Sequence, residues 1–146
     1  MTVICTWCFL LLLVTTVTHY EVLRLLSIGL PSIRVPVRAK LIVVILATFA
    51  SHGVQMMLYG GAYYVAIHIF ALGNLIGGAG STLANCLYFS AETFTSLGFG
   101  DILPSGPLRM MAGSEALNGL LLIGWSASFT YLAMERFWAK PTDNDL

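Results

Sequence analysis

The sequence predicts an all-α membrane protein with three membrane-spanning helices and one re-entrant loop. Its 146 residues are 58% hydrophobic and 10% charged, and the mean hydropathy is +0.84. A soluble domain averages about 45–50% apolar and about 25% charged residues, so a soluble chain of this composition would lack the polar residues to cover its exterior. Three apolar stretches reach the length of about 20 residues that a spanning helix needs.

The first apolar stretch, Thr2–Thr18, contains no charged residue and predicts an N-terminal membrane helix over residues 1–18. It has neither a basic start nor a clear cleavage site, which favours a retained helix over a signal peptide. Residues 19–40 follow with Pro31 and Pro36 and predict an interfacial, cytoplasmic linker. Its basic residues do not repeat every third position, so a voltage-sensing helix is not expected. They are Arg24, Arg34, Arg38 and Lys40.

The rest of the apolar chain, residues 41–138, predicts one continuous membrane unit. Leu41–Tyr59 is its first span, and the glycine pair at 60–61 interrupts the apolar run. The stretch Ala62–Leu72 is apolar again, and the residues leave open whether it prolongs the helix or folds back over the membrane.

A short apolar segment precedes the last span. Within Ser81–Pro104, the apolar part Leu83–Leu97 is too short to cross a bilayer and leads into a glycine-rich segment with Asp101. Irregular backbone at membrane depth is tolerated only where protein or a water-filled cavity shields it, which predicts a re-entrant helix and loop. The last span covers residues 108–138, and residues 139–146 form a short tail.

The distribution of basic residues predicts the orientation. Four lie in the linker, and Arg136 and Lys140 lie at the C-terminal end, whereas only Arg109 lies near the re-entrant loop. By the positive-inside rule, the linker and tail are cytoplasmic, and the loop and N-terminus lie outside.

Charge and cysteine content exclude other classes. The formal net charge is zero, so nucleic-acid binding has no electrostatic basis. Cys5, Cys8 and Cys86 lie in apolar runs without the spacing of paired metal ligands, and we expect buried thiols.

The chemistry of the re-entrant segment suits a cation. A helix over residues 82–95 would point its C-terminus, with about −0.5 of an elementary charge, towards the middle of the membrane. In residues 96–101, glycines alternate with bulky residues, and glycine supplies the backbone angles that let successive carbonyls face one axis. Rings of such carbonyls replace the hydration shell of an ion. The side chains of Leu97 and Phe99 then point away into packing, and the Ser96 hydroxyl adds a ring at the inner end.

The run from Ser90 to Asp101 resembles the selectivity-filter signature of tetrameric potassium channels, T-x-G-[YF]-G-D after a pore helix. The resemblance covers about residues 82–130 and is closest to small bacterial pore-domain "ion channel" proteins. It implies a homotetramer in the plasma (inner) membrane of a bacterium that conducts K⁺ passively. It also implies no enzymatic step, no cofactor and no metal other than K⁺ at the filter.

The resemblance also implies roles for individual residues. Asp101 matches the aspartate at the outer mouth, and Glu92 matches a pore-helix glutamate that shares a proton with this aspartate in some relatives. Serine and phenylalanine stand where threonine and tyrosine are usual. The residues that match the filter positions are Ser96, Leu97, Gly98, Phe99 and Gly100.

Further roles fall on the last span. Gly119, ten residues after Arg109, matches the spacing of a gating hinge, and Gly124 is a second hinge candidate. Ile123 and Ala127, about one turn apart, are expected to line the cavity.

Three alternatives remain open. The two departures from the signature allow a weakly selective monovalent cation channel, and the chain can also be a structural subunit of a larger complex. A haem- or quinone-binding membrane protein would use His19, His52 and His68.

Glu115, a carboxylate within the last span, is either a functional group or a hydrogen-bonding partner of the pore helix.

Overall fold

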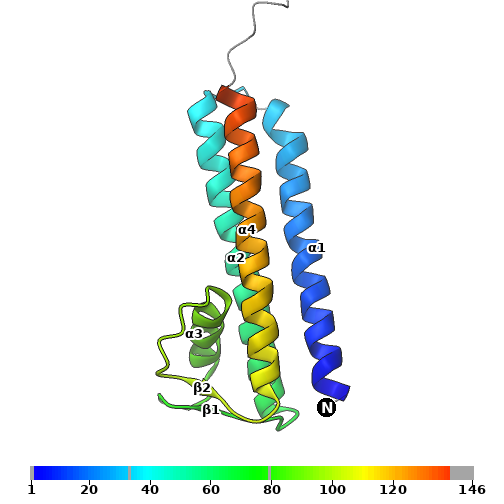
Figure 1. Ribbon diagram of the computed structural model, residues 1–146, viewed down its shortest axis with the longest axis vertical. Coiled ribbons are helices and arrows are strands. Elements are labelled where there is room, and N and C mark those ends of the chain that lie inside the picture. Colours follow the sequence, from blue (N-terminus) through cyan, green and yellow to red (C-terminus); the bar gives the residue numbers. More distant parts are fainter. Residues whose placement is uncertain (1, 33, 79, 139–146) are drawn as a thin grey trace, which may run out of the picture.

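The computed structural model describes residues 2–32, 34–78 and 80–138. Within them the chain forms three long helices, one short helix and one two-stranded sheet (Figure 1). The three long helices are long and apolar enough to cross a membrane, which confirms the predicted all-α membrane fold. The predicted tail, residues 139–146, lies outside the described residues. In chain order, the elements are α1 (Thr2–Ser32), α2 (Val37–His68), β1 (Leu75–Ile76), α3 (Leu83–Phe94), β2 (Leu103–Pro104) and α4 (Leu108–Trp138).

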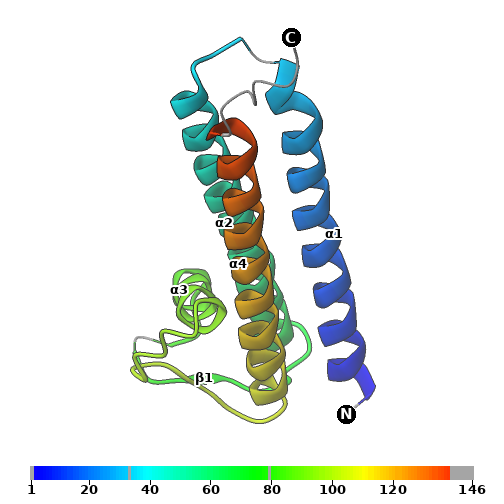
Figure 2. The ribbon, with the colours of Figure 1, turned by 45° about the horizontal axis from the view of Figure 1, so that its top comes forward.

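The long helices α2 and α4 run side by side, and α1 and α3 lie on opposite sides of this pair (Figures 1 and 2). Helix α3 lies near the end of the bundle that carries the start of α1. The turn between α1 and α2 lies at the other end (Figure 1). Helix α4 covers the same residues as the predicted last span.

Helix α1 is longer than predicted. The expectation of a helix over residues 1–18 and a linker over residues 19–40 is wrong, because the helix continues to Ser32, with Pro31 in its last turn. A helix of 31 residues is about 47 Å long and exceeds the hydrocarbon core of about 30 Å. The helix can therefore extend past the core at its C-terminal end, where Arg24 is its only Lys or Arg. His19 is fully buried in the bundle.

Helix α2 settles the question that the glycine pair left open. It runs without a break through residues 60–61, so the start of Ala62–Leu72 prolongs the helix as far as His68. Gly60 marks a close contact between helices, because a Cβ there would lie 2.9 Å from the Cα of Leu87 in α3.

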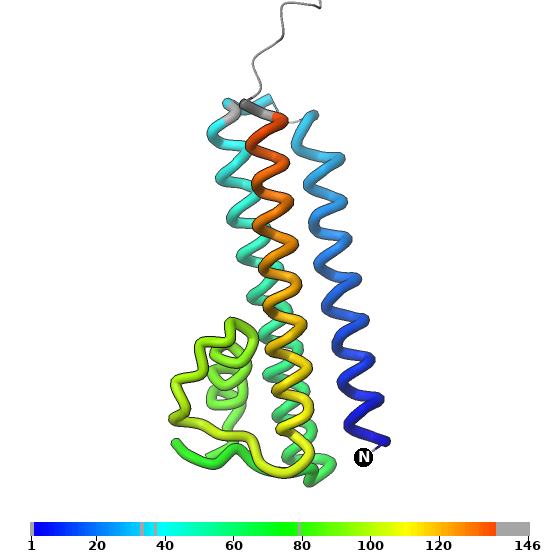
Figure 3. Tube along the Cα trace, viewed as in Figure 1, coloured from blue at the N-terminus to red at the C-terminus, as the bar shows by residue number. Residues whose placement is uncertain are grey.

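The small sheet was not predicted. Strands β1 and β2 pair antiparallel, with Leu75 opposite Pro104 and Ile76 opposite Leu103. They bring the segment before α3 alongside the segment that follows residue 101 (Figure 3). Strands of two residues show no alternation of polar and apolar side chains, which is the signal that predicts a strand.

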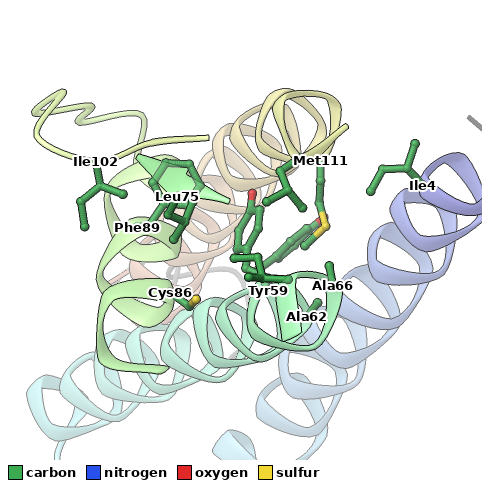
Figure 4. Packing of buried hydrophobic residues seen from close by; sticks show 12 residues of the cluster. Ile4, Tyr59, Ala62, Ala66, Leu75, Cys86, Phe89, Ile102 and Met111 are labelled. Atoms are coloured by element: carbon green, nitrogen blue, oxygen red, sulfur yellow. The ribbon is translucent and has the colours of Figure 1, made fainter. Parts of the chain in front are cut away.

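The core lies at the α3 end of the bundle (Figure 4). Tyr59 of α2, Phe89 of α3 and Met111 of α4 meet there, together with Ile4 of α1. Cys86 is buried among them, whereas Cys5 is exposed, so the expectation of buried thiols is wrong for Cys5. Large apolar side chains elsewhere face outwards, as lipid contact requires. Examples are Phe9, Leu25, Phe49 and Leu121.

Candidate functional site

Helix α3 holds the segment that was predicted to form the filter (residues 96–101, hereafter the filter segment). The Thr82 hydroxyl caps the start of α3 by accepting the N–H of Asn85 at 3.2 Å. Thr95 caps its end, so the helix lies within the predicted range of residues 82–95. Its last carbonyl, that of Phe94, lies against Gly119, about 17 Å along α4 from its start. The filter segment therefore begins well inside the bundle.

The backbone of the filter segment alternates in handedness. The φ angles of Ser96, Gly98 and Gly100 are +57°, +55° and +79°, whereas Leu97 and Phe99 between them are not in the positive-φ region. Gly98 and Gly100 are the alternate positions at which the sequence predicts such angles, whereas the positive angle of Ser96 was not predicted. Glycine adopts such angles without steric cost, and serine does so only with strain.

The filter segment turns its N–H groups towards α3. Those of residues 96–98 donate to carbonyls in the last turn of α3, at distances between 2.9 and 3.3 Å. The described peptide bonds are all trans, and the N–H and C=O of a trans peptide point in opposite directions. The carbonyls of residues 95–97 therefore point away from α3.

The two bulky side chains of the filter segment do not pack within the chain. Leu97 is 60% exposed and Phe99 is 66% exposed, so the expectation that they point into packing is wrong for one chain.

Glu92 lies behind the filter segment. It is buried, its Oε2 has no hydrogen-bond partner among the described residues, and the Asp101 carboxyl is its neighbour. Burial raises the pKa of Glu92, Asp101 raises it further, and the N–H of Phe99 opposes the rise. The structure thus brings together the two carboxyls that the resemblance pairs.

Tyr88 is a member of this group that the sequence analysis missed. Desolvation raises the pKa of its hydroxyl, and the nearby Asp101 carboxyl raises it further. Tyr88 precedes Glu92 by four residues, which places both on one face of α3, and this spacing was the available signal.

Glu115 of α4 contacts both neighbouring helices. Its Oε2 lies 2.6 Å from the hydroxyl of Tyr63 in α2, and its Oε1 lies 2.5 Å from the hydroxyl of Ser90 in α3. It is completely buried. Of the two interpretations from sequence, the geometry supports the hydrogen bond to the predicted pore helix.

The two hinge candidates have different surroundings. A Cβ on Gly119 would overlap the carbonyl oxygen of Phe94, whereas a Cβ on Gly124 would meet nothing within 4 Å. Gly119 therefore lets α3 and α4 approach each other. Ile123 and Ala127, the cavity candidates, are both exposed in the single chain.

The histidines meet in an unexpected pairing. The rings of His19 and His52 stack with centroids 5.1 Å apart, and the Nε2 atoms lie 3.2 and 3.0 Å from the Ser126 hydroxyl. His68 lies apart and contacts the carbonyl of Tyr64 at 3.0 Å. Two stacked rings that share one hydroxyl do not flank a haem, so the geometry does not support the haem interpretation.

Two helices that are long and apolar enough to span a membrane, a short helix packed against one side of this pair (Figure 1), and a loop whose carbonyls point away from the short helix are the arrangement of a pore-loop membrane protein. A family model described as "Ion channel" matches residues 39–136, which is more than half of the chain. The chain therefore belongs to this ion channel family, and the resemblance found in the sequence is confirmed at that level. Helix α1 lies outside the match. Neither a curated protein nor a solved structure matches the chain.

Proposed function

We propose that this ion channel conducts K⁺ passively and selectively, through a filter built by four copies of the chain. The observation that supports this most is the filter segment itself, whose carbonyls at residues 95–97 point away from α3 while φ is positive at every second residue. Such carbonyls take the place of water around a dehydrated cation.

The proposed fourfold assembly follows from the number of filter segments. One chain contributes one segment, and a closed ring of carbonyls needs copies related by cyclic symmetry. The exposure of Leu97 and Phe99 supports this arrangement, because neighbouring copies would cover these side chains.

Ion flux from proteoliposomes that contain only this protein tests the proposal. We expect K⁺ efflux through the purified protein, with Na⁺ permeating far more slowly under an equal gradient. Equal rates for the two ions would instead favour the weakly selective cation channel. No flux of either ion would favour a structural subunit of a larger complex.

We predict that Glu92→Ala changes open probability more than conductance. The raised pKa of Glu92 favours its neutral form, which can bridge α3 to the filter mouth through a proton shared with Asp101. The variant removes this bridge but leaves the carbonyls of the filter segment in place. Single-channel recording is the measurement, and dwell times equal to those of the wild type would exclude the bridge.

The same pair predicts a pH dependence. A raised carboxyl pKa means that the proton is retained above the usual range of glutamate and lost as pH rises through the raised value. Raising the pH on the filter side should therefore change open probability in the wild type but not in Glu92→Ala. Glu135→Ala, which removes an exposed carboxylate on α4, is the control and should keep the wild-type response.

We also propose that the channel lies in the plasma membrane of a bacterium, with its filter side and N-terminus outside. In a variant without native cysteines, a cysteine at Thr2 should react with an impermeant thiol reagent added to intact cells. A cysteine at Val35, in the turn at the other end of the bundle, should react only after permeabilisation. The opposite labelling pattern would reverse the orientation.

A further inference from the structure

Glu115 is joined to a continuous chain of polar groups at the centre of the core. Its Oε2 lies 2.6 Å from the hydroxyl of Tyr63. Its Oε1 lies 2.5 Å from the Ser90 hydroxyl, which also lies 2.9 Å from the backbone carbonyl of Met56. The chain thus runs from α2 through α4 and α3 and back to α2.

A count of protons shows what these contacts require. Three hydrogen bonds need three protons, and the hydroxyls of Tyr63 and Ser90 supply one each. The carbonyl of Met56 can only accept, so Ser90 donates to it and must accept from Glu115. An ionised carboxylate has no proton to donate, whereas a carboxylic acid has one.

The surroundings of Glu115 agree with this count. The titratable groups that face it are Tyr63 and Tyr59, both from α2, and Ser90 faces it from α3. From α1, Cys8 approaches the two tyrosines. Hydroxyl groups do not compensate a buried negative charge in the way that a basic side chain does, so the neutral acid is the form that this site accommodates.

We propose that Glu115 is a protonated carboxylic acid and the positioning residue for α3. As an acid, Glu115 donates a hydrogen bond from Oε1 to Ser90 and accepts one at Oε2 from Tyr63. Ser90 in turn donates to the backbone carbonyl of Met56 in α2. Three helices are thereby joined through one uncharged group. The proposal deepens the proposed function, on which it rests for its link to conduction, because α3 carries the filter segment.

The position of Ser90 explains why this link matters to the filter segment. Ser90 lies in α3, six residues before Ser96, which directly follows the C-cap residue Thr95. Any movement of α3 relative to α2 and α4 therefore moves the start of the filter segment. Glu92 and Asp101 hold the filter side of α3, and Glu115 holds the side that faces the bundle.

Infrared spectroscopy of the purified protein in lipid tests the protonation directly. We expect a carboxylic-acid carbonyl band that is lost in Glu115→Gln and kept in Glu135→Gln, whose carboxylate is exposed. The band should be present between about pH 6 and about pH 7, where an exposed glutamate is ionised. Glu92→Gln identifies any separate band from that residue. A wild-type spectrum without a band attributable to Glu115 would overturn the proposal.

A substitution series tests the positioning role. The amide of Glu115→Gln can donate to Ser90 and accept from Tyr63, so it should keep the wild-type open dwell times within about twofold. Glu115→Ala and Ser90→Ala break the chain and should shorten the dwell times about tenfold, as expected for a buried polar group that loses its partner. Equal effects of Gln and Ala at position 115 would overturn the proposal.

Two matched control variants distinguish the loss of the hydrogen bonds around Glu115 from local effects of a substitution. Ser114→Ala removes the neighbouring hydroxyl on α4, whose one hydrogen bond among the described residues is to Met111 of its own helix, and should behave as wild type. Tyr64→Phe should do the same, whereas Tyr63→Phe should resemble Ser90→Ala.

The two experiments also distinguish the proposals from each other. If the protein passes no ions, the proposed function fails while the infrared result and the thermal stabilities of Glu115→Gln and Glu115→Ala still decide the state of Glu115. If the protein conducts K⁺ but shows no acid band, only the present inference fails.

Discussion

Replacing Gly98 by alanine is expected to abolish K⁺-selective flux. Gly98 has φ of +55°, and a residue with a Cβ pays roughly 1–2 kcal/mol to adopt such an angle. Because four chains would share one filter, the total cost of about 4–8 kcal/mol adds to the strain that each chain already carries at Ser96, and a change of backbone angles at residue 98 would relieve it. The carbonyls that replace water around the ion would then no longer align.

Gly113→Ala is the matched control for this substitution. Gly113 lies in α4, has no positive φ and has open space where a Cβ would stand. Alanine there should leave flux unchanged and favour the helix by about 1 kcal/mol. The measurements are K⁺ and Na⁺ flux from proteoliposomes, together with the size of the purified assembly. A Gly98→Ala channel with wild-type selectivity would show that the filter segment does not coordinate the ion.

Gly119→Ala is expected to have the second largest effect. Its Cβ would lie 2.8 Å from the carbonyl carbon and 3.1 Å from the Cα of Phe94, and it would overlap the carbonyl oxygen. These are backbone atoms that cannot rotate away, so α3 and α4 must separate. Overpacking of this kind costs typically about 1–3 kcal/mol per chain, and it displaces the end of α3 that carries the filter segment.

We therefore expect Gly119→Ala to lower the thermal stability of the purified protein and to suppress flux. Gly124→Ala, which meets nothing within 4 Å, should not lower stability and should favour the helix as Gly113→Ala does. A residue that acted only as a hinge would change gating without loss of stability. Unchanged stability in Gly119→Ala would therefore support the hinge interpretation from sequence over the packing interpretation.

Much of the fold follows from local sequence. The last span, the range of the re-entrant helix and the backbone angles at Gly98 and Gly100 were predictable, because apolar length and glycine spacing act over a few residues. The end of α1 was not, since basic residues and Pro31 suggest an interface whether or not the helix continues past the hydrocarbon core.

The polar contacts in the bundle were beyond sequence reasoning for a different reason. The bond between His19 and Ser126 joins residues 107 positions apart, and nothing in the sequence near either residue specifies its partner. The same holds for Glu115, whose two partners come from different helices. The pairing of Glu92 with Asp101 was found because a short loop connects them and a family signature contains both.

The β1–β2 pair gives the re-entrant segment fixed ends. Residues 77–102 connect Ile76 of β1 to Leu103 of β2, and these two residues pair with each other. The sheet therefore holds the two ends of this loop together. Once its ends are joined, such a loop has already lost much of its conformational entropy. Force applied to the segment before α3, for example by a bound ligand, would therefore reach the outer end of the filter segment without passing through the membrane-spanning helices.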